Sequence, residues 1–215
     1  LVNEVARVFS YLETVKEPEH PFEHLLVGQF NLRSSLIEKI DREIANAKAG
    51  GKGRMILKMN SLQDEEMVNR LYEASQAGVE IKLIIRGICS LVAGVDGLSE
   101  NIEAFSIVDR FLEHARVFIF HNNGDEEVYL SSADWMVRNL SHRVEAAFPV
   151  YNEQIRREIK DYIDIQLSDN VKARTLNENQ TNPYRHSGVD IAIRSQIETY
   201  YYIKRKEEQL GNGEA

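Results

Sequence analysis

The residues between Asp109 and Asn139 bring an imidazole, a guanidinium and two hydroxyls into one short stretch. His114 is followed two positions later by Arg116, and Ser131-Ser132 lies just after the next two apolar runs. An imidazole can attack phosphorus or protonate a leaving oxygen, whereas cations and hydroxyls stabilise the oxygens of a phosphate. These residue types at this spacing indicate phosphate chemistry.

Two β-rich runs are expected to position these groups. Val117–Phe120 and Val128–Leu130 flank the turn sequence Asn122-Asn123-Gly124-Asp125, and Asn-Gly between such runs is a strong hairpin signal. Antiparallel pairing would place His114, at the start of the first strand, beside Ser131-Ser132 at the end of the second. The sequence therefore predicts that the imidazole and the hydroxyls converge at one edge of a sheet.

A strand-helix-strand unit precedes this hairpin. Strands are predicted at Arg54–Asn60 and Val79–Ile88, on either side of a helix at Glu65–Gln76, and such a unit is typical of parallel strands with a right-handed crossover. Each strand carries a basic residue at its carboxyl end, where open α/β sheets bind ligands. These residues are Lys58 and Arg86.

Further periodic segments extend the α/β pattern. An amphipathic helix is predicted after Asn31, further strands near 102–108 and 146–150, and helices at Glu153–Leu167 and Asp190–Lys206. The polar stretch from Asn177 is predicted to be a loop. We expect an α/β fold with a mixed, largely parallel β-sheet that is flanked by helices on both faces.

Composition limits the possible partners. The chain has 215 residues and a net charge of −8, so it repels polyanions in general and must hold a polyanionic substrate through a local basic cluster. Nucleic acid is therefore not an expected partner. No apolar run approaches the ~20 residues of a transmembrane helix. The single Cys89 excludes an internal disulfide and fits a reducing cytoplasm.

The chain is expected to have three parts. Pro18 and Pro21 end an N-terminal helix and mark a linker, so residues 1–24 are assigned to the tail of a preceding domain. Residues 25–206 form the main domain and residues 207–215 a frayed C-terminus. His20 and His24 have the spacing of a metal pair, but Pro21 prevents the helix that this spacing needs. No metal ligands are predicted within the chain.

An ordered set of polar motifs resembles the phospholipase-D-type phosphoryl-transfer signature. That family uses H-x-K, a Gly-Ser-x-Asn turn, and a following Arg-Ser and Glu. The matching motifs here are His114-x-Arg116, Ser131-Ser132-Ala133-Asp134, Arg138-Asn139 and Arg143-x-Glu145. Arg116 thus replaces Lys, Ser131 replaces Gly and Asp134 replaces Asn.

The phospholipase-D-type signature normally occurs twice, with the two histidines facing each other. No other histidine of this chain has Lys or Arg two positions later. Either two chains pair to complete the site, or the second half lies in sequence that is missing here.

A longer string of motifs closely resembles the bacterial polyphosphate kinase family, in the right order from about residue 25 to Tyr202. The matching segments are Ile56-x-x-x-Asn60-Ser61-Leu62, residues 71–79 (LYEASQAGV), residues 85–89 (IRGIC), residues 97–102 (GLSENI), residues 110–114 (RFLEH) and residues 129–136 (YLSSADWM). The chain looks like the C-terminal, phospholipase-D-like domain of such an enzyme, with the tail of the domain before it.

The resemblance implies an enzyme that reversibly transfers the terminal phosphate of ATP to inorganic polyphosphate through a phosphohistidine, with Mg²⁺. In that family the phosphorylated histidine and the magnesium ligands lie in the preceding domain, so the chain alone is expected to be inactive. A cytoplasmic enzyme that binds ATP or ADP and polyphosphate, and that forms homo-oligomers at full length, is expected.

Two family positions carry over to this chain at the phosphates of the nucleotide. They are Arg86 and His114, the latter assisting transfer without carrying the phosphoryl group. From sheet geometry we add five further phosphate-binding candidates: Lys58, Arg116, Ser132, Arg138 and Arg143.

Two other functions remain open from the sequence. The first is a phosphodiesterase or nuclease of the phospholipase-D type, completed by homodimerisation. The second is a non-catalytic module that binds polyphosphate or nucleotide.

Overall fold

One eight-stranded sheet forms the centre of the computed structural model, which describes residues 1–185 and 191–211. The strands are β1 (Leu26–Val27), β2 (Arg54–Met59), β3 (Glu80–Ile85), β4 (Ile102–Ile107), β5 (Arg116–Phe120), β6 (Glu127–Ser131), β7 (Ala146–Pro149) and β8 (Ala173–Thr175). The helices are α1 (Val2–Thr14), α2 (Leu32–Lys48), α3 (Glu65–Gln76), α4 (Val137–Ser141), α5 (Glu153–Leu167) and α6 (Ser195–Gly211), with a 3-10 turn, η1, at Asn122–Gly124.

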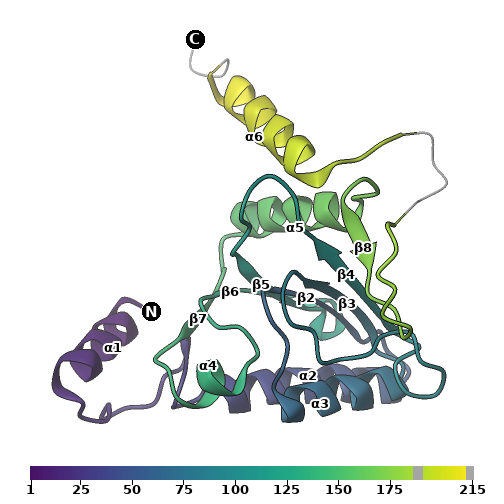
Figure 1. The fold of residues 1–215 in the computed structure, drawn as a ribbon. Helices are drawn as coiled ribbons and strands as arrows, with labels where there is room; N and C mark the ends of the chain where they lie inside the picture. Colours follow the sequence, from purple (N-terminus) through teal and green to yellow (C-terminus); the bar gives the residue numbers. More distant parts are fainter. Residues whose placement is uncertain (186–190, 212–215) are drawn as a thin grey trace.

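Helices cover both faces of this sheet (Figure 1), as the sequence predicts. α2 and α3 lie along one face with the short α4 beside them, whereas α5 crosses the other face and α6 projects beyond it. α1 stands to one side of the sheet. None of the helices in the described ranges combines the length and the apolarity needed to cross a membrane.

Strand alternation divides the apolar core between the two faces. On β2, Met55, Leu57 and Met59 join the cluster that packs under α2 and α3, whereas Ile56 joins the cluster under α5. Successive side chains of a strand point to opposite faces. Lys58 is in phase with Ile56, and so it lies on the α5 face.

The sheet order is β1-β7-β6-β5-β2-β3-β4-β8. Only β2–β3 and β3–β4 pair in parallel, and the other five neighbouring pairs are antiparallel. The mixed α/β fold is therefore confirmed, but the expectation of a largely parallel sheet is wrong. The parallel order that the strand-helix-strand unit predicts is limited to β2, β3 and β4, whereas β5, β6 and β7 pair antiparallel with their neighbours.

The predicted hairpin is present. β5 pairs with β6 in antiparallel register, with Arg116 opposite Ser131 at one end and Phe120 opposite Glu127 at the other. The turn between them uses left-handed backbone conformations at Asn122, Asn123 and Gly124, with φ of 46°, 53° and 101°. Asn and Gly adopt this conformation more readily than other residues, which explains why this sequence turns here.

The C-terminal part differs from its prediction at one strand, β8, and at one helix, α6. β8 was not expected, and it pairs with β4 next to the predicted polar loop. α6 starts at Ser195 and continues to Gly211, so residues 207–211 are helical although a frayed end was predicted. Part of the polar loop (186–190) and the last residues (212–215) lie outside the described residues.

Candidate phosphate-binding site

Three segments that follow or precede strands meet at one edge of the sheet. β2 and β3 run in parallel and end at Met59 and Ile85, while β5 is antiparallel to β2 and begins at Arg116. The start of β5 therefore lies beside the ends of β2 and β3. This topology brings together Asn60, Arg86 and His114, which are far apart in the sequence.

Arg86 and His114 are in direct contact at this edge. Arg86 Nη2 lies 3.3 Å from His114 Nδ1 and 2.6 Å from Asn60 Oδ1. A guanidinium group can only donate hydrogen bonds, so Nδ1 is the acceptor in this contact. We therefore assign the ring proton to Nε2, the nitrogen that does not face Arg86.

Backbone packing fixes the turn that follows β3. Gly87 donates its N–H to Asn60 O at 2.7 Å, and a Cβ on Gly87 would lie only 2.9 Å from that same oxygen. Glycine is the residue that permits such a close approach of two backbone segments. Gly87 therefore lets the ends of β2 and β3 come together beside Arg86.

Arg116 is paired with Asp134. Its Nε and Nη2 lie 3.1 and 3.0 Å from the two carboxylate oxygens, and its Nη1 donates to His114 O at 2.9 Å. Asp134 also accepts the backbone N–H groups of Asn60 and Ser61. Two of the three departures from the phospholipase-D-type signature, Arg for Lys and Asp for Asn, thus contact each other.

Lys58 is buried beneath α5, away from the predicted phosphate contact. Its ammonium group donates to Glu113 Oε2 at 2.6 Å, Gln166 Oε1 at 2.7 Å and Tyr162 Oη at 2.8 Å. An ammonium group has three donors, and all three are engaged. The prediction of Lys58 as a phosphate ligand is therefore replaced by a structural role, because strand alternation turns its side chain to the α5 face.

The loop of residues 108–115, which carries His114, is anchored by its own acidic side chains. Asp109 forms an ion pair with Arg194 at 2.6 Å, and Glu113 receives hydrogen bonds from Lys58, Tyr162, Gln166 and Gln196. Gln196 also bonds the backbone N–H and C=O of Phe111, at 2.9 and 2.8 Å. The start of α6 thus holds the loop in place.

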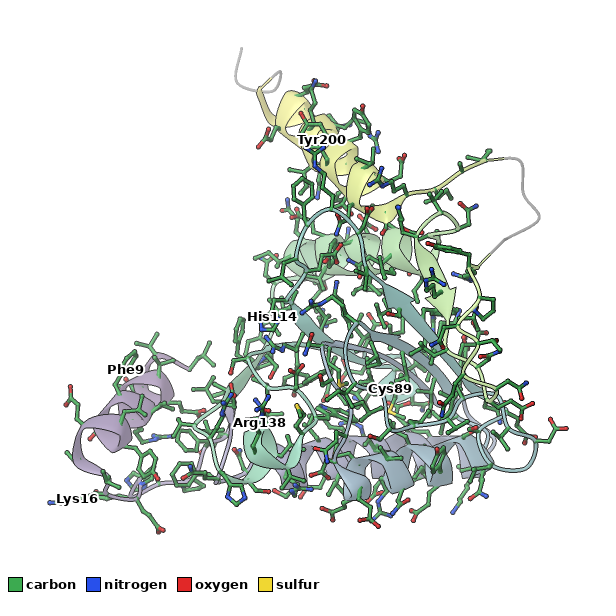
Figure 2. All side chains as sticks on the ribbon, in the orientation of Figure 1. Phe9, Lys16, Cys89, His114, Arg138 and Tyr200 are labelled. Atoms are coloured by element: carbon green, nitrogen blue, oxygen red, sulfur yellow. The ribbon has the colours of Figure 1, made fainter. Side chains whose placement is uncertain are left out.

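The remaining predicted residues lie on the flank formed by α4 and β7. Ser132 Oγ donates to Glu145, whose other oxygen accepts from Asn139 Nδ2 at 2.6 Å. Arg138 and Arg143 are exposed. Figure 2 shows Arg138 on the same flank as His114, with Arg138 on the α4 side and His114 on the α5 side. Both guanidinium groups remain candidate phosphate ligands.

Comparison with known proteins identifies the family. Residues 25–196 match the family described as polyphosphate kinase C-terminal domain 2. This chain belongs to the polyphosphate kinase C-terminal domain family.

Relatives of known name agree with this assignment. The chain is 48% identical over 209 residues to polyphosphate kinase of Vibrio cholerae and 47% identical over 208 residues to that of Escherichia coli K12. In each case the match covers 97% of this chain and 30% of the relative. The polyphosphate kinase domain described here therefore spans less than a third of the length of these relatives.

Solved structures extend the likeness to the fold. The crystal structure of polyphosphate kinase from Porphyromonas gingivalis superposes with a TM-score of 0.91 at 47% identity, over 95% of this chain and 31% of that one. Nuc from Salmonella typhimurium, a phospholipase D family member, superposes with a TM-score of 0.51 at 14% identity, over 71% of this chain and 97% of its own. The phospholipase-D-like fold of the polyphosphate kinase domain is thus confirmed.

Four residues of this site were not among the predicted site residues. Asn60 bridges to Arg86, Asp134 holds Arg116, and Glu113 and Gln196 anchor the loop of residues 108–115. Asn60 follows Lys58 by two positions at the end of a predicted strand, so its place at the edge could have been inferred from position alone. The contact of Gln196 with the loop could not have been inferred from position, because Gln196 lies on α6, 82 residues after His114.

Proposed function

We propose that this domain binds the phosphate groups of ATP, ADP and inorganic polyphosphate, as the C-terminal part of a polyphosphate kinase. In the longer enzyme it would take part in reversible transfer of the terminal phosphate of ATP to polyphosphate. The observation that carries the proposal is the direct contact of Arg86 with His114 at the end of β3.

Arg86 and His114 have complementary roles in this proposal. The guanidinium group would neutralise phosphate oxygens, as cations at phosphoryl-transfer sites do. His114, with its proton on Nε2, would donate that proton or a hydrogen bond to a bridging or leaving oxygen. Because its Nδ1 accepts from Arg86, His114 acts as the assisting histidine, and the phosphohistidine itself is proposed to lie upstream of this chain.

Magnesium is proposed as the cofactor of the full enzyme, with its ligands outside this chain. The carboxylates of the site, Glu113, Asp134 and Glu145, each accept hydrogen bonds from protein donors. In the described ranges, one group of residues has metal-ligand spacing, Glu4, Glu23 and His24, but Glu4 accepts the backbone N–H groups of residues 23–25. When bound, magnesium would neutralise charge on the phosphate oxygens.

Binding of inorganic tripolyphosphate and ATP to the 215-residue chain tests the proposal. Isothermal titration calorimetry should detect binding that Arg86→Ala weakens by about tenfold or more. Arg157→Ala is the matched control, because Arg157 is an exposed guanidinium on α5 that pairs with Glu153. Equal affinities of the wild type and Arg86→Ala would contradict the proposed site.

The same preparation distinguishes the other functions. Hydrolysis of bis(p-nitrophenyl) phosphate by the chain would support a phosphodiesterase and overturn the kinase proposal. Radioactive phosphate retained on the chain after incubation with ATP would overturn the proposal that the nucleophile lies upstream. Phosphate binding without turnover is the result expected for one part of a kinase site.

Two further properties of the full enzyme are part of the proposal. A cytoplasmic location is supported by the single Cys89, because secreted domains commonly use paired cysteines. A homo-oligomeric state at full length is proposed from the likeness to the polyphosphate kinase family alone. Cell fractionation and light scattering of the full-length protein test these two properties.

A further inference from the structure

We propose that Asn60, Arg116 and Asp134 are positioning residues that hold Arg86 and His114 in one arrangement for phosphate binding. The identity of the ligand rests on the proposed function above, whereas the positioning itself rests on the contacts of the five side chains and their backbone.

The five residues form a closed ring of hydrogen bonds. Arg86 contacts His114, His114 O accepts from Arg116, and Arg116 pairs with Asp134. Asp134 accepts the backbone N–H of Asn60 at 2.8 Å, and Asn60 Oδ1 accepts from Arg86 at 2.6 Å, which closes the ring. Each residue of the ring is therefore held from two sides.

Arg116 and Asp134 are poorly placed to contact a ligand. Their side chains are 10% and 7% exposed, and their charges compensate each other. The carboxylate accepts four hydrogen bonds, from the Nε and Nη2 atoms of Arg116 and from two backbone N–H groups. The Arg116–Asp134 pair would therefore affect a ligand only indirectly, through His114 and Asn60. Of the two arginines in the ring, Arg86 is the one available to contact phosphate.

Asn60 determines how Arg86 is oriented. The two hydrogens of Arg86 Nη2 are directed to Asn60 Oδ1 and His114 Nδ1. The amide group of Asn60 is itself fixed, because its Nδ2 donates to Ser61 Oγ at 2.9 Å. Loss of the Asn60 side chain would leave one Nη2 hydrogen without its acceptor and free the guanidinium to rotate.

Asn60→Ala is the main test, because it leaves the Arg116–Asp134 pair intact. Arginine side-chain NMR relaxation reports the order parameter of the Arg86 Nε–H group in the 215-residue chain without any ligand. We expect this order parameter to fall in Asn60→Ala, and the affinity for inorganic tripolyphosphate to fall about tenfold. Asp134→Asn should have the same two effects, because Arg116 would lose its counter-charge.

Glu127→Gln is the matched control. Glu127 pairs with Lys39 and Arg42 at the opposite end of the same hairpin, so this variant removes an ion pair without touching the ring. It should leave the order parameter of Arg86 and the affinity unchanged. Circular dichroism establishes that each variant is folded before it is compared.

The two proposals fail in different ways. An unchanged order parameter of Arg86 in folded Asn60→Ala would overturn the positioning role, whatever happens to binding. If the order parameter falls but neither Asn60→Ala nor Arg86→Ala alters tripolyphosphate binding, the positioning role stands and the proposed phosphate site is wrong.

Discussion

Lys58 Nζ lies 2.6 Å from Glu113 Oε2, although the two residues are 55 positions apart and lie on different segments of the fold. Their side chains are 5% and 19% exposed. Glu113 precedes His114 in the sequence, so this buried ion pair anchors the segment that carries the histidine. Lys58, which its position in the sequence assigns to phosphate, instead holds the loop that carries His114.

Glu113→Gln should strongly destabilise the chain. Burial already lowers the pKa of Lys58 despite the neighbouring carboxylate, and the variant would leave this ammonium without a counter-charge. Removing one partner of a buried ion pair costs about 3–5 kcal/mol. Urea unfolding followed by circular dichroism measures the free energy of unfolding. Glu73→Gln, which breaks an exposed pair with Arg70, should cost less than about 1 kcal/mol.

Replacing both partners separates the charge from the packing. The double variant Lys58→Met, Glu113→Gln removes the unpaired ammonium, and so it should be more stable than Glu113→Gln alone. A double variant as unstable as the sum of the two single variants would mean that the pair has no coupling energy.

Gln196→Ala should loosen the loop of residues 108–115. The side chain is largely buried and bonds both backbone groups of Phe111, so its loss leaves the Phe111 N–H without its acceptor. We expect a stability loss of about 1–3 kcal/mol and faster hydrogen exchange of the Phe111 amide. Gln154→Ala, at an exposed position of α5, should change neither quantity. Unaltered exchange at Phe111 in Gln196→Ala would contradict the anchoring role.

The contribution of Asp134 to stability should depend on pH. Burial alone would raise the pKa of Asp134, but the hydrogen bonds and charge of Arg116 outweigh it and the net pKa is lowered. A carboxylate whose pKa is lower in the folded state stabilises the fold above the unfolded pKa of ~3.9. This stabilisation is lost as the pH falls through the still lower folded pKa.

Comparison of the wild type with Asp134→Asn over pH checks this dependence. The difference in unfolding free energy should be about 2–4 kcal/mol at pH 7 and should shrink as the pH falls below ~4. Asp96→Asn, on an exposed loop, should differ little from the wild type at pH 7. A difference between wild type and Asp134→Asn that is constant from pH 7 to pH 3 would contradict a lowered pKa.

Local patterns predicted most of the helices and strands, because apolar periodicity and capping residues are properties of neighbouring residues in the sequence. Glu65–Gln76 and Glu153–Leu167 have the predicted bounds, since the side chains of Asp64 and Asn152 cap their first turns. The direction of strand pairing was harder, because it depends on which strands become neighbours. β5 pairs with β2, with Lys58 opposite Val117 59 positions later in the sequence, and no local signal gives that choice.

The site divides in the same way. Arg86 and His114 follow from motif resemblance and lie together as expected, but the roles of Lys58 and Arg116 depend on partners that are distant in the sequence. Lys58 meets Tyr162 and Gln166 on α5, and Arg116 meets Asp134. Sequence position gave the edge of the sheet at which these cations lie. Sequence position could not predict which side chains accept the hydrogen bonds of Lys58 and Arg116.

The contact between Arg86 and His114 predicts that Nε2 is the nitrogen that donates to the phosphate in a full-length kinase containing this domain. Alanine at either position should lower the rate by ~10²-fold or more, because one proton donor or phosphate-stabilising group is lost.

His114→Gln and His114→Asn then separate the two nitrogens. A glutamine amide can replace the Nε2 donor, whereas an asparagine amide reaches only the Nδ1 position and can accept from Arg86. Since Nδ1 is already used by Arg86, turnover of ATP should be higher in His114→Gln than in His114→Asn. The reverse order of activities would mean that Nδ1 faces the phosphate and that the contact with Arg86 is broken when substrate binds.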